Sequence, residues 1–186
     1  MASNTDSQRL FFALWPPDTL RNAIHRNYRR AVQGSGGKPV PESNYHITLA
    51  FLGSLDPTGT LKAHRAADQV SAAAFDLQLD RLGFWSEAGV LWLGTAQPST
   101  KARKLATQLA QVLRAQGLEP DAKPFVAHLS LARKVIKPGE LRAARAIHWH
   151  VDGFALLRSH THGRNSEYQL LASWPLLSRA AGPGEL

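Results

Sequence analysis

The feature that most constrains the fold is a repeated pattern: each half of the chain has a similar series of predicted elements before a similar histidine motif. A strand, a turn and a helix are expected before Tyr45-His-Ile-Thr-Leu49, and a similar series before Ala127-His-Leu-Ser-Leu131. Side chains alternate along a strand, so in each segment the histidine and the hydroxyl residue point to one face and the aliphatic residues to the other. The sequence therefore predicts two related lobes, each presenting an imidazole and a hydroxyl from a strand.

The remaining pattern favours an α+β fold over a nucleotide-binding parallel sheet, because the chain has neither a GxGxxG sequence nor a P-loop. The apolar run from Arg9 to Trp15 predicts a central strand covered on both faces. Pro16-Pro17 ends this strand and opens a helix that stops before Gly34. Further helices are expected over 60–73 and from a cap at Ser99 to Gly117, with a short helical stretch after Lys137-Pro-Gly139. Further strands are expected over 45–52, 75–84, 90–94, 127–133, 149–159 and 167–174, with a turn over 53–57.

Length and charge bound the organisation and the partners. The chain has 186 residues, and we expect residues 8–179 to form a single domain of two pseudo-symmetric lobes, with flexible ends at 1–7 and 180–186. It contains no cysteine, which excludes thiol nucleophiles, disulfides and cysteine zinc sites. A net charge of +8 favours an anionic partner such as nucleic acid. No apolar run approaches the roughly 20 residues of a membrane span, and no signal peptide is visible, so a cytoplasmic protein is expected.

The two histidine motifs point to phosphoryl chemistry. Hydrolysis of a phosphodiester removes a proton from water and gives one to the departing oxygen, on opposite sides of phosphorus. Imidazole titrates near pH 6.5, so His46 and His128 suit these two roles, and Thr48 and Ser130 suit hydrogen bonds to the phosphate oxygens. The alternative is a pair of core histidines bonded to the neighbouring hydroxyls.

On these motifs the chain resembles the 2H phosphoesterases, named for paired H-x-[ST] sequences, and among them the bacterial RNA 2′,3′-cyclic phosphodiesterases, historically called 2′-5′ RNA ligases. The resemblance also covers Arg9 to Ala13, Asn44 to Gly53, Leu91 to Gly94, Pro124-Phe125, His128 to Arg133 and Tyr168 to Trp174. Ala127 departs from the proline usual before the second histidine, and Ser130 replaces threonine but keeps the hydroxyl. The fold implied is bilobal α+β, with two antiparallel sheets flanking a central groove and helices outside.

The resemblance implies hydrolysis of RNA 2′,3′-cyclic phosphate ends to 2′-phosphomonoesters, without metal or cofactor, by a monomer. His46 is expected to donate a proton and His128 to accept one, with Thr48 and Ser130 holding the phosphate. Arg133 is a candidate substrate contact, although strict alternation puts it opposite His128 unless the strand twists or bulges. Phe11 resembles an aromatic residue near the nucleoside but suits the core as well.

Several alternatives stay open. The same chemistry run backwards forms 2′-5′ linkages, and a module that only binds RNA ends would carry the same motifs. Nucleotide cyclic phosphates or ADP-ribose cyclic phosphate could replace RNA as substrate. The pairs His148/His150 and His160/His162 have metal-ligand spacing, but no third ligand follows from the sequence, so solvent-facing or RNA-facing roles are expected.

Overall fold

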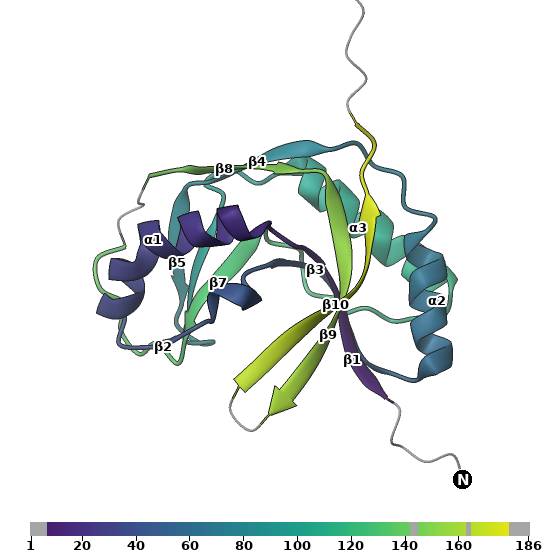
Figure 1. Cartoon of the computed structure of the whole chain (residues 1–186), viewed down its shortest axis with the longest axis horizontal. Coiled ribbons are helices and arrows are strands. Elements are labelled where there is room, and N and C mark those ends of the chain that lie inside the picture. The colour runs from purple at the N-terminus through teal and green to yellow at the C-terminus, as the bar shows by residue number, and fades with distance from the viewer. Residues whose placement is uncertain (1–6, 142–144, 163–164, 179–186) are drawn as a thin grey trace, which may run out of the picture.

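The computed structural model describes residues 7–141, 145–162 and 165–178, and within them it is an α+β structure (Figure 1). One four-stranded antiparallel sheet has the order β10-β9-β1-β3, a second has the order β2-β7-β6-β5, and β4 pairs with β8. The first sheet consists of β1 (Gln8–Leu14), β3 (Ile47–Leu55), β9 (Gly153–His162) and β10 (Asn165–Pro175). The second consists of β2 (Lys38–Pro39), β5 (Arg81–Trp85), β6 (Val90–Gly94) and β7 (His128–Arg133). The predicted α+β class and the two antiparallel sheets are confirmed.

Three α-helices lie in the described part of the chain: α1 (Asp18–Gly34), α2 (Pro57–Ala67) and α3 (Thr100–Ala115). A 3-10 turn, η1 (Glu42–Asn44), leads into β3. The predicted cap of α3 is confirmed, because the Ser99 side chain accepts a hydrogen bond from the Ala102 amide at 3.2 Å. Gly117, at φ +75°, follows the end of that helix. No described helix has the length and hydropathy needed to cross a membrane.

The first strand is buried on both faces, as its sequence predicts, and lies between β9 and β3. Leu10, Phe12 and Leu14 belong to the main core. Phe11 and Ala13 face the other way and form a second, smaller cluster with two residues of β9. Phe11 of this second cluster lines the cavity described below, as do Phe51 and Tyr168, which pack against the cluster.

Two strands that the sequence predicts as continuous are each divided at an aspartate. The expected strand 75–84 breaks at Asp80, whose carboxylate accepts a hydrogen bond from the Ala96 amide at 2.7 Å. The expected strand 149–159 breaks at Asp152, whose carbonyl accepts from the Leu176 amide at 2.7 Å. The detached pieces, β4 (Phe75–Leu79) and β8 (Ile147–Val151), pair with each other. The third sheet is therefore a correction to the predicted layout.

Smaller corrections concern the region after His46. The expected turn over 53–57 is wrong, because β3 continues through Gly53, which has φ +71°, as far as Leu55. The helix expected over 60–73 begins earlier, at Pro57, where Asp56 caps it by accepting from the Gly59 amide at 2.6 Å, and it ends at Ala67. The short helix expected after Gly139 falls partly on 142–144, outside the described residues. The predicted flexible ends, 1–7 and 180–186, also lie outside the described residues, apart from Ser7.

Candidate active site

The first motif histidine lies between η1 and β3. Its Nδ1–H donates a hydrogen bond to the carbonyl oxygen of Asn44 at 2.7 Å. Because a carbonyl oxygen only accepts, the neutral ring carries its proton on Nδ1 and leaves Nε2 unprotonated. Nε2 of His46 lies 3.1 Å from Oγ1 of Thr48, as the alternation rule predicts for residues of one face. The ring nitrogen available for proton transfer is therefore Nε2.

The second motif histidine repeats this arrangement. His128 is the first residue of β7, and its Nδ1–H donates to the carbonyl oxygen of Val126 at 2.8 Å. In both motifs the acceptor is the carbonyl two residues before the histidine. The main chain thus fixes the same tautomer in both rings and leaves both Nε2 atoms free of the backbone.

A β-bulge in β7 decides which residues face the groove after the second motif. Ser130 and Ala132 lie opposite consecutive residues of β6, which leaves Leu131 as an extra residue. The bulge reverses the alternation, so Arg133 shares the face of Ser130 rather than the opposite face. Strict alternation would turn Arg133 away from the groove. The single inserted residue, Leu131, turns it toward the groove instead.

The first motif carries a bulge at the corresponding position of β3. Thr48 and Ala50 lie opposite consecutive residues of β1, so Leu49 is the extra residue. Phe51 therefore shares the face of Thr48. The residues that follow the hydroxyl are Leu-Ala in both motifs, and Phe51 and Arg133 occupy equivalent positions in the two sheets.

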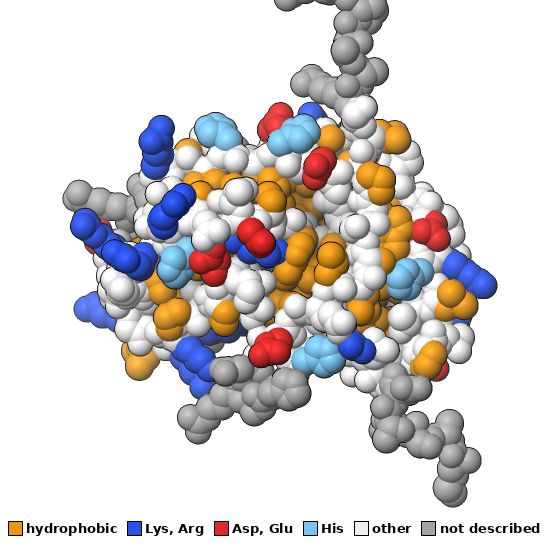
Figure 2. All heavy atoms as spheres, viewed as in Figure 1, with side chains coloured by type: hydrophobic (Ala, Val, Ile, Leu, Met, Phe, Trp, Pro, Cys, Tyr) orange, Lys and Arg blue, Asp and Glu red, His pale blue; other side chains and the backbone are white. Residues whose placement is uncertain are grey.

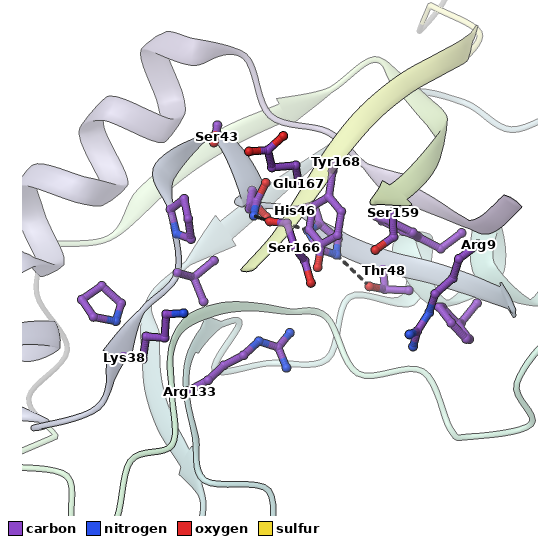
Figure 3. Close-up of a pocket in the computed structure, with 16 residues that line it drawn as sticks. Arg9, Lys38, Ser43, His46, Thr48, Arg133, Ser159, Ser166, Glu167 and Tyr168 are labelled. Carbon is purple, nitrogen blue, oxygen red and sulfur yellow. Dashed lines mark hydrogen bonds between the residues drawn. The ribbon is translucent and has the colours of Figure 1, made fainter. Parts of the chain in front are cut away.

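A cavity of about 530 Å³ lies between the two large sheets (Figure 3). It brings together four of the predicted site residues, namely His46, Thr48, Phe11 and Arg133. His128 and Ser130 do not line this cavity, although β7 lies against β3. Further lining residues that the sequence did not single out for the site include Arg9, Lys38, Asn44, Phe51, Ser159, Ser166, Glu167 and Tyr168.

Aromatic rings surround both histidines. The His46 ring centroid lies 4.9 Å from that of Phe11 and 5.1 Å from that of Tyr168, the latter edge-on. The His128 ring lies edge-on to Trp85 at 4.4 Å. Phe11 is only 3% exposed, so it both packs in the small core cluster and forms part of the wall against which His46 rests.

Burial and neighbouring cations hold both imidazoles in the neutral form. Burial is the largest cause that lowers the pKa of His46 to about 4. The positive charges of Arg133, His128 and Arg21 act in the same direction, and the hydrogen bond to Asn44 opposes them. Burial also lowers the pKa of His128, and Arg133 acts in the same direction. A phosphate anion between these groups would offset the cations and favour protonation.

His148, His150 and His160 are not among the residues that line this cavity. His148 and His150 are exposed on β8, and Nδ1 of His150 lies 2.8 Å from a carboxylate oxygen of Asp76. Nε2 of His160 lies 3.3 Å from Oε1 of Gln169. The His162 side chain is outside the described residues. Within the described ranges, no three His, Cys, Asp or Glu side chains gather as metal ligands.

Comparison with known proteins agrees with this geometry. The model of the LigT-like phosphoesterase family matches residues 14–92. An RNA 2′,3′-cyclic phosphodiesterase of Escherichia coli is 33% identical over 129 residues, covering 69% of this chain and 73% of that protein. One of Thermus thermophilus is 29% identical over 95% of this chain and 97% of its own.

Solved structures extend the likeness to the whole fold. The crystal structure of E. coli LigT complexed with 3′-AMP has a TM-score of 0.84 at 29% identity, covering 92% of this chain and 99% of that one. A structure described as a phosphoesterase has a TM-score of 0.85 with the same identity and coverage. The chain belongs to the LigT-like phosphoesterase family.

Proposed function

We propose that this protein hydrolyses RNA 2′,3′-cyclic phosphate ends to 2′-phosphomonoesters, with His46 and His128 as the acid/base pair. The observation that carries the proposal is the matched pair of imidazoles, each bound through Nδ1 to a main-chain carbonyl and each left with Nε2 for proton transfer. The relatives named RNA 2′,3′-cyclic phosphodiesterases support the choice of substrate.

The proposed step balances with protein groups alone. Nε2 of His128 takes a proton from water as the water oxygen bonds to phosphorus, and the bond from phosphorus to the 3′-oxygen breaks. Nε2 of His46 gives its proton to that departing oxygen, which leaves the phosphate on the 2′-oxygen. The hydroxyls of Thr48 and Ser130, with the Arg133 guanidinium, stabilise the charge that develops on the non-bridging oxygens. Proton exchange with solvent restores both rings.

The electrostatics adds a requirement to this mechanism. His46 donates a proton only if it is charged, yet its pKa in the unliganded protein is about 4. The bound phosphate anion has to raise that pKa, so substrate binding and proton uptake by the site are coupled. Binding of the cyclic phosphate thus favours the protonated form of His46 that the mechanism requires.

The direct test uses an oligoribonucleotide that ends in a 2′,3′-cyclic phosphate, with products separated by their end chemistry. His46→Ala and His128→Ala should each lower kcat by about 100-fold or more, because each removes one proton transfer. The double variant should be scarcely slower than either single one, since the two groups act in one step.

The matched control is His148→Ala, because His148 is an exposed histidine on β8 away from the cavity. It should keep wild-type kcat. If either motif variant retained more than a tenth of wild-type activity, the acid/base assignment would be wrong. Tight binding of cyclic ends by the wild type without turnover would instead identify a module that only binds RNA ends.

The proposal also covers assembly and location. We propose that the enzyme acts as a monomer. We place its activity in the cytoplasm. Light scattering during turnover tests the monomeric state, because activity confined to an oligomeric fraction would contradict it. Fractionation of cells tests the cytoplasmic location.

A further inference from the structure

The cavity extends along the first sheet beyond the histidine motif to an arginine that the proposed mechanism leaves unused. Arg9 lies near the start of β1, opposite Ser159 of β9, and both residues line the cavity (Figure 3). The guanidinium carbon of Arg9 lies 5.0 Å from the ring centroid of Phe51. A cation held over a ring keeps its N–H donors at its edges, where they can reach an anion.

Strand spacing separates this arginine from the position of the cyclic phosphate. Along the groove face of β1, Ala13 lies opposite Thr48, and Phe11 lies opposite Phe51. These two rows are about 7 Å apart, because two residues of an antiparallel strand span that length. The Arg9 guanidinium lies over the Phe51 row, so it stands about one such step beyond the phosphate held at Thr48.

The charge of the cavity suits a ligand with two anionic groups. Arg133 enters from β7 on one side and Arg9 from β1 on the other, and both line the cavity. Among the described lining residues, Lys38 adds a third cation, against one carboxylate, that of Glu167. One cyclic phosphate carries one negative charge, which Arg133 alone balances, and a protonated imidazole adds a further positive charge. Arg9 is therefore available to a second phosphate.

We propose that Arg9, supported by Phe51, binds a second phosphate of the substrate, on the 5′ side of the nucleotide whose cyclic phosphate is cleaved. This inference rests on the proposed function and specifies its substrate class. The second phosphate is either the internucleotide linkage of an RNA chain or the 5′-phosphate of a single nucleotide. Both present the same oxygens to a guanidinium, and Ser159 supplies a neighbouring hydroxyl.

The test compares three substrates: a nucleoside 2′,3′-cyclic phosphate with a 5′-hydroxyl, the same compound with a 5′-phosphate, and a dinucleotide with the same cyclic end. For the wild type, kcat/KM should be about tenfold higher for each substrate with a second phosphate, since one charge-assisted hydrogen bond contributes about that factor. Arg9→Gln should remove most of this preference, and Arg9→Lys should keep part of it. Phe51→Leu should also reduce it, by releasing the guanidinium.

Arg103→Gln is the matched control, because Arg103 is an exposed arginine on α3. It should leave the substrate preference as in the wild type. A loss confined to the dinucleotide would identify the internucleotide linkage as the ligand, and a loss on both two-phosphate substrates would include the 5′-phosphate. An equal fall on all three substrates, or no fall on any, would overturn the inference. Thermal unfolding of each variant identifies any that fails to fold.

A binding measurement separates this inference from the proposed function. Calorimetry compares adenosine 2′-monophosphate with adenosine 2′,5′-bisphosphate, and it needs no turnover. The wild type should bind the bisphosphate about tenfold more tightly, and Arg9→Gln should lose that difference. If no cyclic substrate were hydrolysed, the proposed function would fail, whereas equal affinity of the wild type for both ligands would defeat the second-phosphate site.

Discussion

His46 and His128 are oriented by main-chain carbonyls rather than by carboxylates. A carboxylate partner would stabilise the charged ring, whereas a neutral carbonyl does so more weakly, and burial outweighs it in both cases. Each imidazole therefore stays neutral until an anion arrives. The two histidines are therefore a neutral pair that becomes charged when phosphate binds, and not a permanently charged pair.

The low pKa of His46 makes a prediction about stability. An unfolded histidine titrates at 6.5 and the folded one at about 4, so between these values the unfolded chain binds more protons. The contribution of His46 to stability is therefore full above pH 6.5 and is lost as pH falls toward 4. The loss is on the order of 2 kcal/mol, after allowance for the partial exposure of the ring.

Urea unfolding measured across this pH range checks the point. His46→Gln should flatten the dependence of the unfolding free energy on pH, because glutamine does not titrate. His148→Gln, which removes an exposed histidine on β8, should keep the wild-type slope. Equal slopes for His46→Gln and the wild type would contradict the buried, neutral state of His46.

The roles of the two histidines are separable with a modified substrate. When sulfur replaces the 3′-oxygen, the leaving group needs no proton, so the acid is dispensable while the base is still required. With His46 as the acid, His46→Ala should recover much of its lost kcat on the sulfur substrate, and His128→Ala should stay slow. Recovery by His128→Ala alone would exchange the roles, and recovery by neither would argue that both rings only bind phosphate.

At the scale of elements, the strand that carries each motif is readable from the sequence, but its bulge is not. The alternation rule correctly places His46 with Thr48, and it fails for Arg133, because one inserted residue at Leu131 reverses the faces. The repeated Leu-Ala after each hydroxyl is the available signal, and it lies in the sequence itself. A bulge depends on hydrogen bonding to a neighbouring strand, which a local pattern does not contain.

The same limit explains the divided strands. Asp80 and Asp152 interrupt apolar runs whose two parts both read as strand, and only the tertiary partners show that each run serves two sheets. Arg9 and Lys38 line the cavity but were not predicted as site residues, because neither belongs to a histidine motif. What the sequence predicted well is what repeats within it or alternates over a few residues.

Asn44 connects η1 to β10 through its side chain and to His46 through its main-chain carbonyl. Nδ2 of Asn44 in η1 donates to the carbonyl oxygen of Ser166 in β10 at 2.6 Å, and the carbonyl of the same asparagine holds His46. Asn44→Ala should lower the unfolding free energy by about 1–3 kcal/mol, since it leaves a part-buried carbonyl without its donor. It should also lower kcat, because the hairpin of β9 and β10 no longer fixes η1.

Ser166→Ala is the matched control for stability, because the bond is to the main-chain oxygen of that residue and survives the substitution. Chemical denaturation of both variants gives the comparison. A stability of Asn44→Ala equal to that of Ser166→Ala would show that the hydrogen bond contributes nothing to the fold. A kcat loss shared equally by both variants would assign the effect to the cavity wall instead.

Over the whole molecule, the helices link the two large sheets. Helix α3 connects β6 to β7 of the second sheet but packs against β3 of the first. Residues of both sheets share the main core, among them Leu10, Phe12, Leu93 and Leu129. We therefore propose that the two lobes unfold together. Tryptophan fluorescence and far-ultraviolet circular dichroism should report one midpoint in urea, and two separated transitions would contradict a single unit.

The positive charge of the whole chain predicts that salt weakens activity on long RNA substrates more than on short ones. The net charge is +8, and the lysine and arginine side chains on the face in Figure 2 gather mainly over α1, where Arg26, Arg29 and Arg30 are exposed. Phosphates of an RNA chain that reach such a surface release bound counterions, and added salt opposes this release. The logarithm of kcat/KM should therefore fall more steeply with the logarithm of salt concentration for a ten-nucleotide RNA than for a mononucleotide.

The mononucleotide with the same cyclic end is the internal control, because it reports the effect of salt on the chemistry and on the cyclic phosphate alone. Each further phosphate contact should add about 0.7 to the slope for a single strand. Replacing Arg26, Arg29 and Arg30 together by glutamine should reduce the slope for the RNA and leave that for the mononucleotide as it was. Equal slopes for both substrates in the wild-type protein would confine recognition to the cavity, with α1 acting only as a solvated face.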